Sequence, residues 1–486
     1  MDVQKILSRK EALVYFIGIK GTGMCALAEL LHNAGTRVSG SDRAEVFYTD
    51  GILTSLGIPY HESFAKEHIR ANTDLVIYSA AYSFETNPEM AEAKAQGIPI
   101  IKYTDALGAY SASFDACGIA GVHGKTTTTA MAGTLLRSAG VPAQILAGSA
   151  VGAFGGHSTL NLGTKYFVAE TCEYRRHFLS FHPRRILLTS VEGDHQDYYP
   201  TYESIRDAFL EYGRLLPLGG ELIYCADDPG AVEVAETLDR EGRGIRCIPY
   251  GFSATGAFRI RSYHVTHEQG EMSLAGFPGP LQVCIPGRHS ALNATAALAL
   301  TGSLVKKEFG GDTSDGWHEE RREGVRKALA EFRGSKRRSE IVGKASGILF
   351  MDDYGHHPTA VRTTLEGIKA FYPTRRLVLS FMSHTYTRTA SLLDEFAACF
   401  EKADVLILHK IYASARETYT GGVTGETLFE KTRALRDTVY YIDEPEAAVE
   451  WLKALLRPGD LFLTMGAGDN WKLGRALLTH YEGVSR

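Results

Sequence analysis

A short stretch near residue 120 carries the residue types that bind phosphate. Segment 118–129 holds three glycines, then Lys125 and a run of threonines that begins at Thr126. Glycines let backbone N–H groups curl around an anion, and the start of a helix adds a partial positive charge. A lysine at this position reaches the outer phosphates of a nucleotide, and the Thr126 hydroxyl suits a magnesium ion. The pattern predicts a nucleoside-triphosphate phosphate loop.

The sequence on either side of this loop supports the prediction. Residues 117–120 are weakly polar, and the periodic apolar segment 130–136 follows the threonines, which is typical of a strand, a tight loop and a helix. The spacing departs from the standard pattern, because Ile119 rather than a glycine stands six residues before Lys125. The alternative is a glycine-rich turn followed by a threonine helix cap.

A second glycine-rich loop lies near the N-terminus. Residues 14–19 form a continuous apolar run, the loop Lys20–Gly23 follows, and a helix is expected to continue to residue 34. Residues 38–42 predict another strand, which ends in Asp42. A βαβ unit with an acidic residue about twenty positions after its glycines is typical of dinucleotide or nucleotide-sugar binding. Because the glycines do not fit the GxGxxG spacing, a purely structural turn is the alternative.

Apolar strands alternate with helical segments through the rest of the chain, which predicts an α/β protein with mainly parallel sheets. We expect three domains: a Rossmann-like domain of residues 1–107, a central phosphate-loop domain of residues 108–330 and a Rossmann-like domain of residues 331–486. The polar segment 306–326 predicts a solvated loop and a surface helix. Residues 466–469 form a glycine turn that is either a phosphate-binding turn or a plain tight turn. The further strands expected are 75–79, 98–101, 166–170, 186–190, 222–225, 348–351, 377–380, 405–408 and 461–465.

The composition is typical of a soluble globular protein. Of the 486 residues, 44% are apolar and 22% are charged, and the formal net charge is −5, so nucleic acid and anionic membranes are not expected partners. Seven scattered cysteines without a CxxC pair indicate reduced thiols. The chain shows neither a signal-peptide pattern nor an apolar stretch of membrane-spanning length. We expect a cytoplasmic protein that is a monomer or a homodimer.

Taken in order along nearly the whole chain, the motifs resemble those of the Mur ligases of peptidoglycan precursor synthesis. The segments that carry the resemblance are 16–24 (FIGIKGTGM), 39–42 (SGSD), 121–127 (GVHGKTT), 169–170 (AE), 194–195 (DH), 286–289 (PGRH), 352–358 (DDYGHHP) and 384–389 (HTYTRT). The first of these segments and the 352–358 run are most similar to the family members that add L-alanine.

The resemblance implies an ATP-dependent ligase that joins L-alanine to the carboxylate of UDP-N-acetylmuramate through an acyl phosphate, with ATP and Mg²⁺ as cofactors. The first domain is then expected to hold the UDP-sugar, the central domain ATP, and the third domain the amino acid. One alternative is the related recycling ligase that attaches a tripeptide to the same sugar, although its loop usually reads Thr-Phe-Met where this chain has Thr22–Met24. Two others are a folylpolyglutamate-type ligase, which would not need the nucleotide-sugar unit 18–42, and a catalytically silent binding protein.

The resemblance also implies roles for residues of this chain. The ATP contacts are expected from Gly121, Val122, His123, Gly124, Lys125, Thr126, Thr127, His289, Asn293, Arg338 and Asp353. The UDP-sugar contacts are expected from Gly18, Gly21, Thr22, Gly23, Met24, Ser41 and Asp42. The catalytic residues implied are Lys125, Glu170, His195 and Arg338, and the magnesium ligands are Thr126, Glu170 and His195. The amino-acid contacts are Tyr354, His356 and Arg388, with Arg388 clamping the carboxylate.

The chemistry of the side chains favours Glu170 over His195 as a magnesium ligand. Glu170 ends an apolar strand, where an unpaired carboxylate is costly unless a cation receives it. Magnesium prefers oxygen to nitrogen, so Glu170 is a better ligand than His195. Without the resemblance, His195 is equally well explained as an ordinary loop histidine. For Arg337, beside Arg338, a solvated basic cluster is an equal alternative.

Three segments depart from the family pattern. Ser290 stands where a second asparagine is usual, and a hydroxyl does not offer the paired donor and acceptor of an amide to a nucleotide. Residues 382–385 read Met-Ser-His-Thr instead of Gln-Pro-His-Arg, which removes an arginine near the amino-acid pocket and bears on the choice among alanine, serine and glycine. Residues 171–174 replace Ala-Asp-Glu-Ser, but Glu173 keeps the carboxylate.

Overall fold

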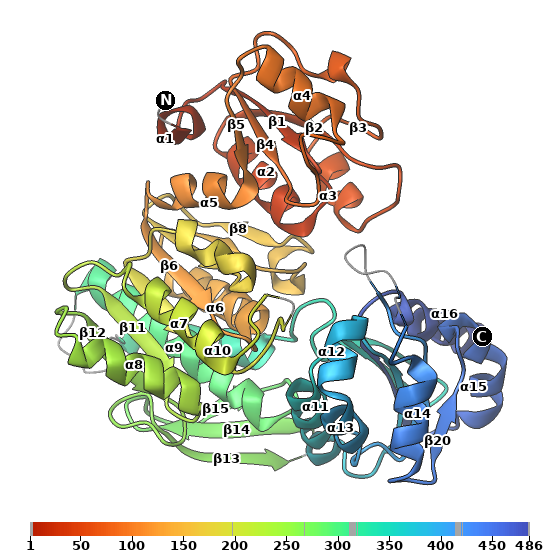
Figure 1. The fold of residues 1–486 in the computed structure, drawn as a ribbon. Helices are drawn as coiled ribbons and strands as arrows, with labels where there is room; N and C mark the ends of the chain where they lie inside the picture. Colours follow the sequence, from red (N-terminus) through yellow and green to blue (C-terminus); the bar gives the residue numbers. More distant parts are fainter. Residues whose placement is uncertain are drawn as a thin grey trace. The chain divides into compact units, whose positions relative to one another are not determined.

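The computed structural model describes residues 3–196, 198–266, 268–310, 317, 319–413, 419 and 421–484. The chain divides into two compact units, each described by itself. The first unit gathers Met1–Glu192, Ile205–Ala254 and Ala296–Val325, and the second gathers Gly193–Ser204, Thr255–Thr295 and Arg326–Arg486. Each unit contains two β-sheets (Figure 1).

The N-terminal sheet of the first unit is parallel throughout, with strand order β3-β2-β1-β4-β5. Its strands are β1 (Leu13–Ile17), β2 (Arg37–Ser41), β3 (Tyr60–His61), β4 (Leu75–Tyr78) and β5 (Ile100–Lys102). The helical segments around it are α1 (Val3–Leu7), α2 (Thr22–Asn33), α3 (Thr49–Ser55), η1 (Lys66–His68), α4 (Pro88–Ala95) and α5 (Tyr103–Ser111). This arrangement confirms the predicted Rossmann-like βαβ unit, and it places the glycine loop between β1 and α2.

The second sheet of the first unit has strand order β12-β11-β10-β6-β9-β7-β8. It is parallel except for β8, which pairs antiparallel with β7. Its strands are β6 (Asp115–Ala120), β7 (Ala143–Leu146), β8 (Thr159–Asn161), β9 (Tyr166–Glu170), β10 (Arg185–Leu188), β11 (Glu221–Cys225) and β12 (Arg246–Tyr250). The helical segments in this part of the chain are α6 (Lys125–Ala139), η2 (Gly152–Phe154), η3 (Tyr174–Ser180), α7 (Tyr202–Gly213), α8 (Pro229–Arg240), α9 (Arg288–Phe309) and α10 (Glu319–Glu331). Helices α7, α9 and α10 each contribute residues to both units.

The predicted loop at 306–326 starts later than expected. Helix α9 is continuous to Phe309, and α10 begins at Glu319. The polar residues Lys306 and Lys307 therefore form the last turn of a long helix, where basic side chains interact favourably with the helix dipole. The expected Gly311–Asp312 part of the loop lies outside the described residues.

The second unit contains a small antiparallel sheet that the sequence analysis did not predict. Its strands are β13 (Ile260–Thr266), β14 (Gln269–Leu274) and β15 (Leu281–Val283), in the order β13-β14-β15. The inward positions of β14 are Gly270, Met272 and Leu274. Because a glycine occupies one of them, the alternating apolar pattern of a strand is too short to recognise; a Cβ at Gly270 would lie 2.8 Å from the Tyr263 ring.

The C-terminal sheet has strand order β16-β17-β21-β18-β19-β20, and only β16 is antiparallel to its neighbour. Its strands are β16 (Glu340–Ala345), β17 (Ile348–Asp353), β18 (Arg376–Met382), β19 (Val405–Leu408), β20 (Val439–Tyr441) and β21 (Asp460–Gly466). The helical segments are α11 (Pro358–Phe371), α12 (Tyr386–Ser391), α13 (Leu393–Ala398), α14 (Gly425–Arg433), η4 (Pro445–Ala448), α15 (Val449–Leu455) and α16 (Asn470–Val484). Two apolar clusters pack on this sheet, one with α11, α13 and α14 and one with η4, α15 and α16.

The described residues include no helix long and apolar enough to cross a membrane. All seven cysteines are free thiols, as the sequence indicates. Four are buried, and Cys172 is exposed.

The central strand β6 has room for nothing larger than glycine at position 118, which gives a prediction about stability. A Cβ there would lie 1.9 Å from the Tyr212 hydroxyl oxygen, and Tyr212 is buried and stacked on Phe178 at 4.4 Å. We expect Gly118→Val to cost about 1–3 kcal/mol of stability. Gly51→Ala is the control, because a Cβ there meets nothing within 4 Å and alanine favours the helix. Thermal unfolding should show a lower midpoint for the first variant only; equal midpoints would contradict the packing described.

Candidate active site

The predicted phosphate loop is the turn between β6 and α6, at the carboxyl end of the sheet. Gly121 has φ 133° and Gly124 has φ 80°, a backbone region that favours glycine. A Cβ on Gly121 would lie 2.1 Å from the Thr189 side-chain oxygen, so the loop also needs glycine for space. Gly124 caps α6 without a side-chain acceptor, which leaves the helix entrance suited to an anion.

Lys125, the first residue of α6, is held by a carboxylate from a neighbouring strand end. Its Nζ lies 2.8 Å from Glu173 Oε2 and also donates to the Gly121 carbonyl oxygen. Burial alone lowers the pKa of Lys125, but the nearby acidic groups, Glu173 foremost and Glu170 among the others, together outweigh burial, and the pKa is raised. The lysine therefore carries a fixed positive charge beside the loop.

Glu170, which ends β9, has the environment of a cation ligand. The strand pairs in parallel with β6, so Glu170 lies beside Ile119, just before the phosphate loop. Its Oε2 is buried and accepts no hydrogen bond from the described residues. A Cβ at Gly148 would lie 2.3 Å from this oxygen, so the glycine leaves the carboxylate its space. Buried carboxylate oxygens are normally paired, and a hard cation such as Mg²⁺ would fit here.

The other predicted magnesium ligands lie in different units. Thr126 is buried in the first turn of α6, in the same unit as Glu170. His195 belongs to the second unit, where its backbone has φ 55° and its N–H donates to Asp194 Oδ1 at 2.7 Å. A single magnesium site formed by all three residues stays a prediction.

The N-terminal glycine loop is held in place by hydrogen bonds to the end of β2. The N–H groups of Gly18 and Ile19 both donate to the Ser41 carbonyl oxygen, at 2.8 and 3.1 Å. Asp42 accepts from the Lys20 N–H at 2.8 Å and from the Tyr82 hydroxyl at 2.9 Å. Three of the predicted sugar-nucleotide residues, Gly18, Ser41 and Asp42, thus shape the loop.

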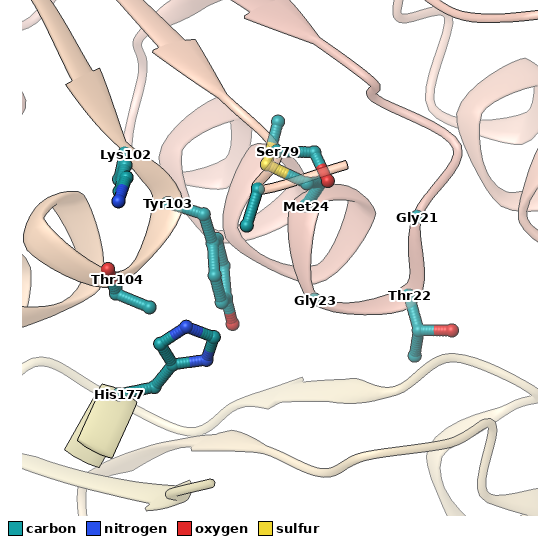
Figure 2. A pocket seen from close by; sticks show the side chains of 10 residues that line it. Gly21, Thr22, Gly23, Met24, Ser79, Lys102, Tyr103, Thr104 and His177 are labelled. Carbon is teal, nitrogen blue, oxygen red and sulfur yellow. The ribbon is translucent and has the colours of Figure 1, made fainter. Parts of the chain in front are cut away.

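The other four predicted sugar-nucleotide residues line a pocket of about 240 Å³ at the start of α2. Its walls, shown in Figure 2, are Gly21, Thr22, Gly23, Met24, Ser79, Ala80, Lys102, Tyr103, Thr104 and His177. Tyr103 packs closely on the helix start, because a Cβ at Gly23 would lie 2.7 Å from its hydroxyl oxygen. Burial raises the pKa of Tyr103, and the negative charge of Glu170 raises it further, so the Tyr103 hydroxyl stays protonated beside the pocket.

Four of the lining residues were not predicted from the sequence: Lys102, Tyr103, Thr104 and His177. Lys102 ends β5, and Tyr103 and Thr104 come directly after it. Because ligands bind at the carboxyl ends of parallel strands, the end of a predicted strand could have indicated these three residues. No such signal exists for His177, because it lies in the irregular segment η3, where Arg175 and Arg176 have positive φ.

Lys20, although it belongs to the glycine loop, is engaged elsewhere. Its side chain is fully buried, and Nζ lies 2.8 Å from Glu62 and 3.1 Å from Asp50. Burial alone lowers the pKa of Lys20, but these two carboxylates outweigh it and the pKa is raised. The amine therefore fastens the loop to α3 and the region after β3.

In the second unit, β17 ends in two buried carboxylates that are held differently. Asp353 accepts from the N–H groups of Ser339 and Gly355 at 2.6 and 2.7 Å, and burial raises its pKa. Asp352 pairs with Arg337 at 3.0 Å. Arg338 stacks over the Tyr354 ring at 5.4 Å. The ATP contacts expected of Asp353 and Arg338 stay predictions.

Arg337 is structural rather than part of a solvated cluster. Besides Asp352, it donates to the carbonyl oxygens of Gly466 at 2.7 Å and Gly468 at 3.3 Å. These bonds fasten the glycine turn 466–469 to the end of β17, so the turn has a structural role.

The predicted amino-acid residues lie together in the second unit. His356 lies 5.0 Å from Tyr354 and 5.4 Å from His384, measured between ring centroids. Burial lowers the pKa of His356 well below its usual range, and the Arg388 charge lowers it further, so the ring is neutral. Arg388 is buried and forms an ion pair with Asp194, a partner that the sequence analysis did not identify.

The remaining nucleotide residues lie at the start of α9. Asn293 is buried, and a Cβ at Gly287 would lie 2.4 Å from the His289 ring. Ser290, the departure from the family pattern, is buried and donates to the Pro286 carbonyl oxygen at 2.8 Å. Its hydroxyl stabilises the helix start. The contacts of His289 and Asn293 with a nucleotide stay predictions.

Comparison with known proteins agrees with this arrangement. Residues 13–115 match the Mur ligase family, catalytic domain; residues 119–301 match the Mur ligase middle domain; and residues 337–468 match the Mur ligase, glutamate ligase domain. UDP-N-acetylmuramate–L-alanine ligase of Treponema pallidum is 52% identical, over 96% of both chains. The enzyme of the same name from Borreliella afzelii is 38% identical, over 95% of this chain and 97% of that one. The chain belongs to the Mur ligase family.

Solved structures give the same fold. The crystal structure of UDP-N-acetylmuramate-alanine ligase from Thermotoga maritima is 25% identical, with a TM-score of 0.75 and coverage of 97% of this chain and 99% of that one. A murein peptide ligase from Psychrobacter arcticus has a TM-score of 0.67 at 23% identity, covering 96% of this chain and 98% of that one, and shares the fold. The predicted three-domain α/β fold is confirmed.

The position of Lys125 predicts the effect of removing its charge. Because its amine is fixed beside the loop, we expect Lys125→Ala to lower kcat by about a hundredfold or more while the fold is kept. Lys165→Ala is the control, since Lys165 pairs with Glu308 on the surface. Steady-state ATP turnover and circular dichroism of both variants check this. Near-normal turnover of the Lys125 variant would remove the loop from the mechanism.

Proposed function

We propose that this protein is an ATP-dependent ligase that joins L-alanine to the carboxylate of UDP-N-acetylmuramate in peptidoglycan precursor synthesis, acting in the cytoplasm as a monomer or homodimer. The observation that carries the proposal is the 52% identity, along 96% of both chains, to a ligase named for this reaction. The phosphate loop with Lys125 and the unpaired Glu170 oxygen support it independently.

The chemistry explains why these residues are needed. A carboxylate oxygen is a very poor leaving group, so the sugar-borne carboxylate first attacks the γ-phosphate of ATP, forming an acyl phosphate and releasing ADP. The amine of alanine then attacks the acyl carbon, and phosphate leaves. Both steps bring negative charges together, so fixed positive charge and correct positioning supply most of the catalysis. Lys125 and the start of α6 provide that charge at the phosphates.

Magnesium is the second part of the proposal. Glu170, Thr126 and His195 would hold the ion, with Glu170 as the principal ligand because its buried oxygen lacks another partner among the described residues. When bound, the ion neutralises phosphate charge and orients the reacting carboxylate. Glu173 keeps Lys125 beside the loop, and the N–H groups of Val122 and His123 fix the loop itself by donating to the backbone and side-chain oxygens of Ser190.

The three substrates would be divided among three domains, residues 1–107, 108–330 and 331–486. The UDP-sugar would enter the pocket at the start of α2, with its diphosphate at the glycine loop. Residues Gly121–Thr127, His289, Asn293, Arg338 and Asp353 would contact ATP. Tyr354, His356 and Arg388 would contact the amino acid.

Phosphate release is the experiment that tests the function. The protein is supplied with UDP-N-acetylmuramate, ATP, Mg²⁺ and one acceptor at a time: alanine, serine, glycine or the tripeptide. We expect turnover with alanine, dependent on both ATP and the sugar. Turnover with the tripeptide alone would establish the recycling reaction instead, and no turnover with any acceptor would indicate a silent binding protein.

Magnesium dependence tests the role of Glu170. Replacing its carboxylate by an amide removes the charge that holds the cation, so Glu170→Gln should raise the Mg²⁺ concentration for half-maximal activity by about tenfold or more. Glu236→Gln, on the exposed face of α8, is the matched control. A titration of activity with MgCl₂ compares them. An unchanged half-maximal concentration in the Glu170 variant would exclude this carboxylate as the ligand.

A further inference from the structure

The ion pair between Asp194 and Arg388 is more deeply buried than a surface contact. Arg388 Nη2 lies 2.8 Å and Nε 3.1 Å from Asp194 Oδ1, and each side chain is only 6% exposed. Both residues belong to the second unit, although they are 194 positions apart in the sequence. His356 and His384, with Tyr354, lie beside the pair.

We propose that Asp194 and Arg388 form one receptor for a zwitterion, in which Arg388 binds the α-carboxylate of the amino acid and Asp194 binds its α-ammonium group. Asp194 is then a specificity-determining residue. This inference rests on the function proposed above and adds to it the group that recognises the positive end of the substrate.

Both Arg388 and Asp194 keep hydrogen-bonding groups that the bonds within the pair do not use. A guanidinium carries five N–H donors. Asp194 takes one from Nε and one from Nη2, and Nη1 lies 3.1 Å from His384 Nδ1. On the other partner, Asp194 Oδ1 receives the guanidinium and the His195 N–H. Its Oδ2 lies 3.7 Å from His195 Nε2, which is beyond hydrogen-bond length. One carboxylate oxygen is thus available to an ammonium group.

Charge explains why such a receptor selects amino acids. An isolated buried arginine would attract any small carboxylate, because burial strengthens electrostatic attraction. The pair of Asp194 and Arg388 has no net charge, so a simple anion meets attraction and repulsion together. A zwitterion laid with its charges opposite to those of the pair is attracted at both ends. The pair therefore favours alanine over the many carboxylates that lack an amine.

The receptor contains one guanidinium, because the chain has a threonine at the start of α12 where the family commonly has a second arginine. Thr385, where the family commonly has arginine, caps the helix by accepting from the Arg388 N–H at 3.4 Å. The position thus helps to fix the backbone of Arg388.

Two ligands distinguish a zwitterion receptor from a merely structural ion pair. Alanine is the substrate, and propionate, which is alanine without its amine, is measured as a competitive inhibitor. Asp194→Asn removes the negative charge of the receptor. The variant therefore no longer attracts the ammonium group of alanine, and it no longer repels the carboxylate of propionate. We expect the KM for alanine to rise by about tenfold to a hundredfold, and the Ki for propionate to fall, while the KM for ATP is unchanged.

The controls separate charge from folding. Asp460→Asn removes a buried carboxylate from another ion pair of the same unit, with Arg376 at 2.7 Å, at the opposite end of β18. It should leave both constants unchanged. Asp194→Glu keeps the charge and should retain the wild-type preference for alanine over propionate. If Asp194→Asn does not fold, the glutamate variant is measured in its place.

Three outcomes would count against the inference. An unchanged KM for alanine in Asp194→Asn, a KM and a Ki that rise together, or an Asp194→Glu enzyme that prefers propionate would each overturn the receptor while leaving the ligase function intact. A wild-type protein that does not use alanine would instead overturn the proposed function itself.

Discussion

Burying an ion without a partner is costly, and this constraint explains how the candidate site is built. Lys125 is held by Glu173, Lys20 by Asp50 and Glu62, and Arg388 by Asp194. Each pair keeps a charged group in place within the folded chain. Glu170 is different, since its buried Oε2 accepts no hydrogen bond from the described residues. The same constraint therefore explains the fixed cations within each unit, and it singles out Glu170 in the first unit as the buried carboxylate that a cation would suit.

Parallel sheets place these charges at their carboxyl ends. The glycine loop follows β1, the phosphate loop follows β6, and Glu170 ends β9. In the second unit, Asp353 ends β17 and Arg388 follows β18. Because the carboxyl ends of parallel strands meet at one edge, residues far apart in sequence come together there. The strands supply the core, and the residues just after them supply the chemistry.

Much of this was predictable from the sequence, for a physical reason. A glycine loop between an apolar strand and a helix leaves a local pattern, so β1, β6 and their loops were located, and buried parallel strands such as β18 read as continuous apolar runs. Contacts between distant segments leave no such pattern. The pairing of Asp194 with Arg388, the hold of Glu173 on Lys125 and the entry of His177 into the pocket depend on tertiary packing. The small sheet β13–β15 was missed because glycine occupies an inward position in its central strand.

In the proposed reaction ATP converts a sugar-borne carboxylate into an acyl phosphate, and the transfer of an oxygen isotope from sugar to phosphate reports this step. UDP-N-acetylmuramate is prepared with heavy oxygen in its carboxylate and is incubated with the protein, ATP, Mg²⁺ and alanine. We expect the phosphate released to carry one heavy oxygen from the sugar for each amide bond formed. Phosphate without the label, or amide formation without ATP consumption, would contradict it.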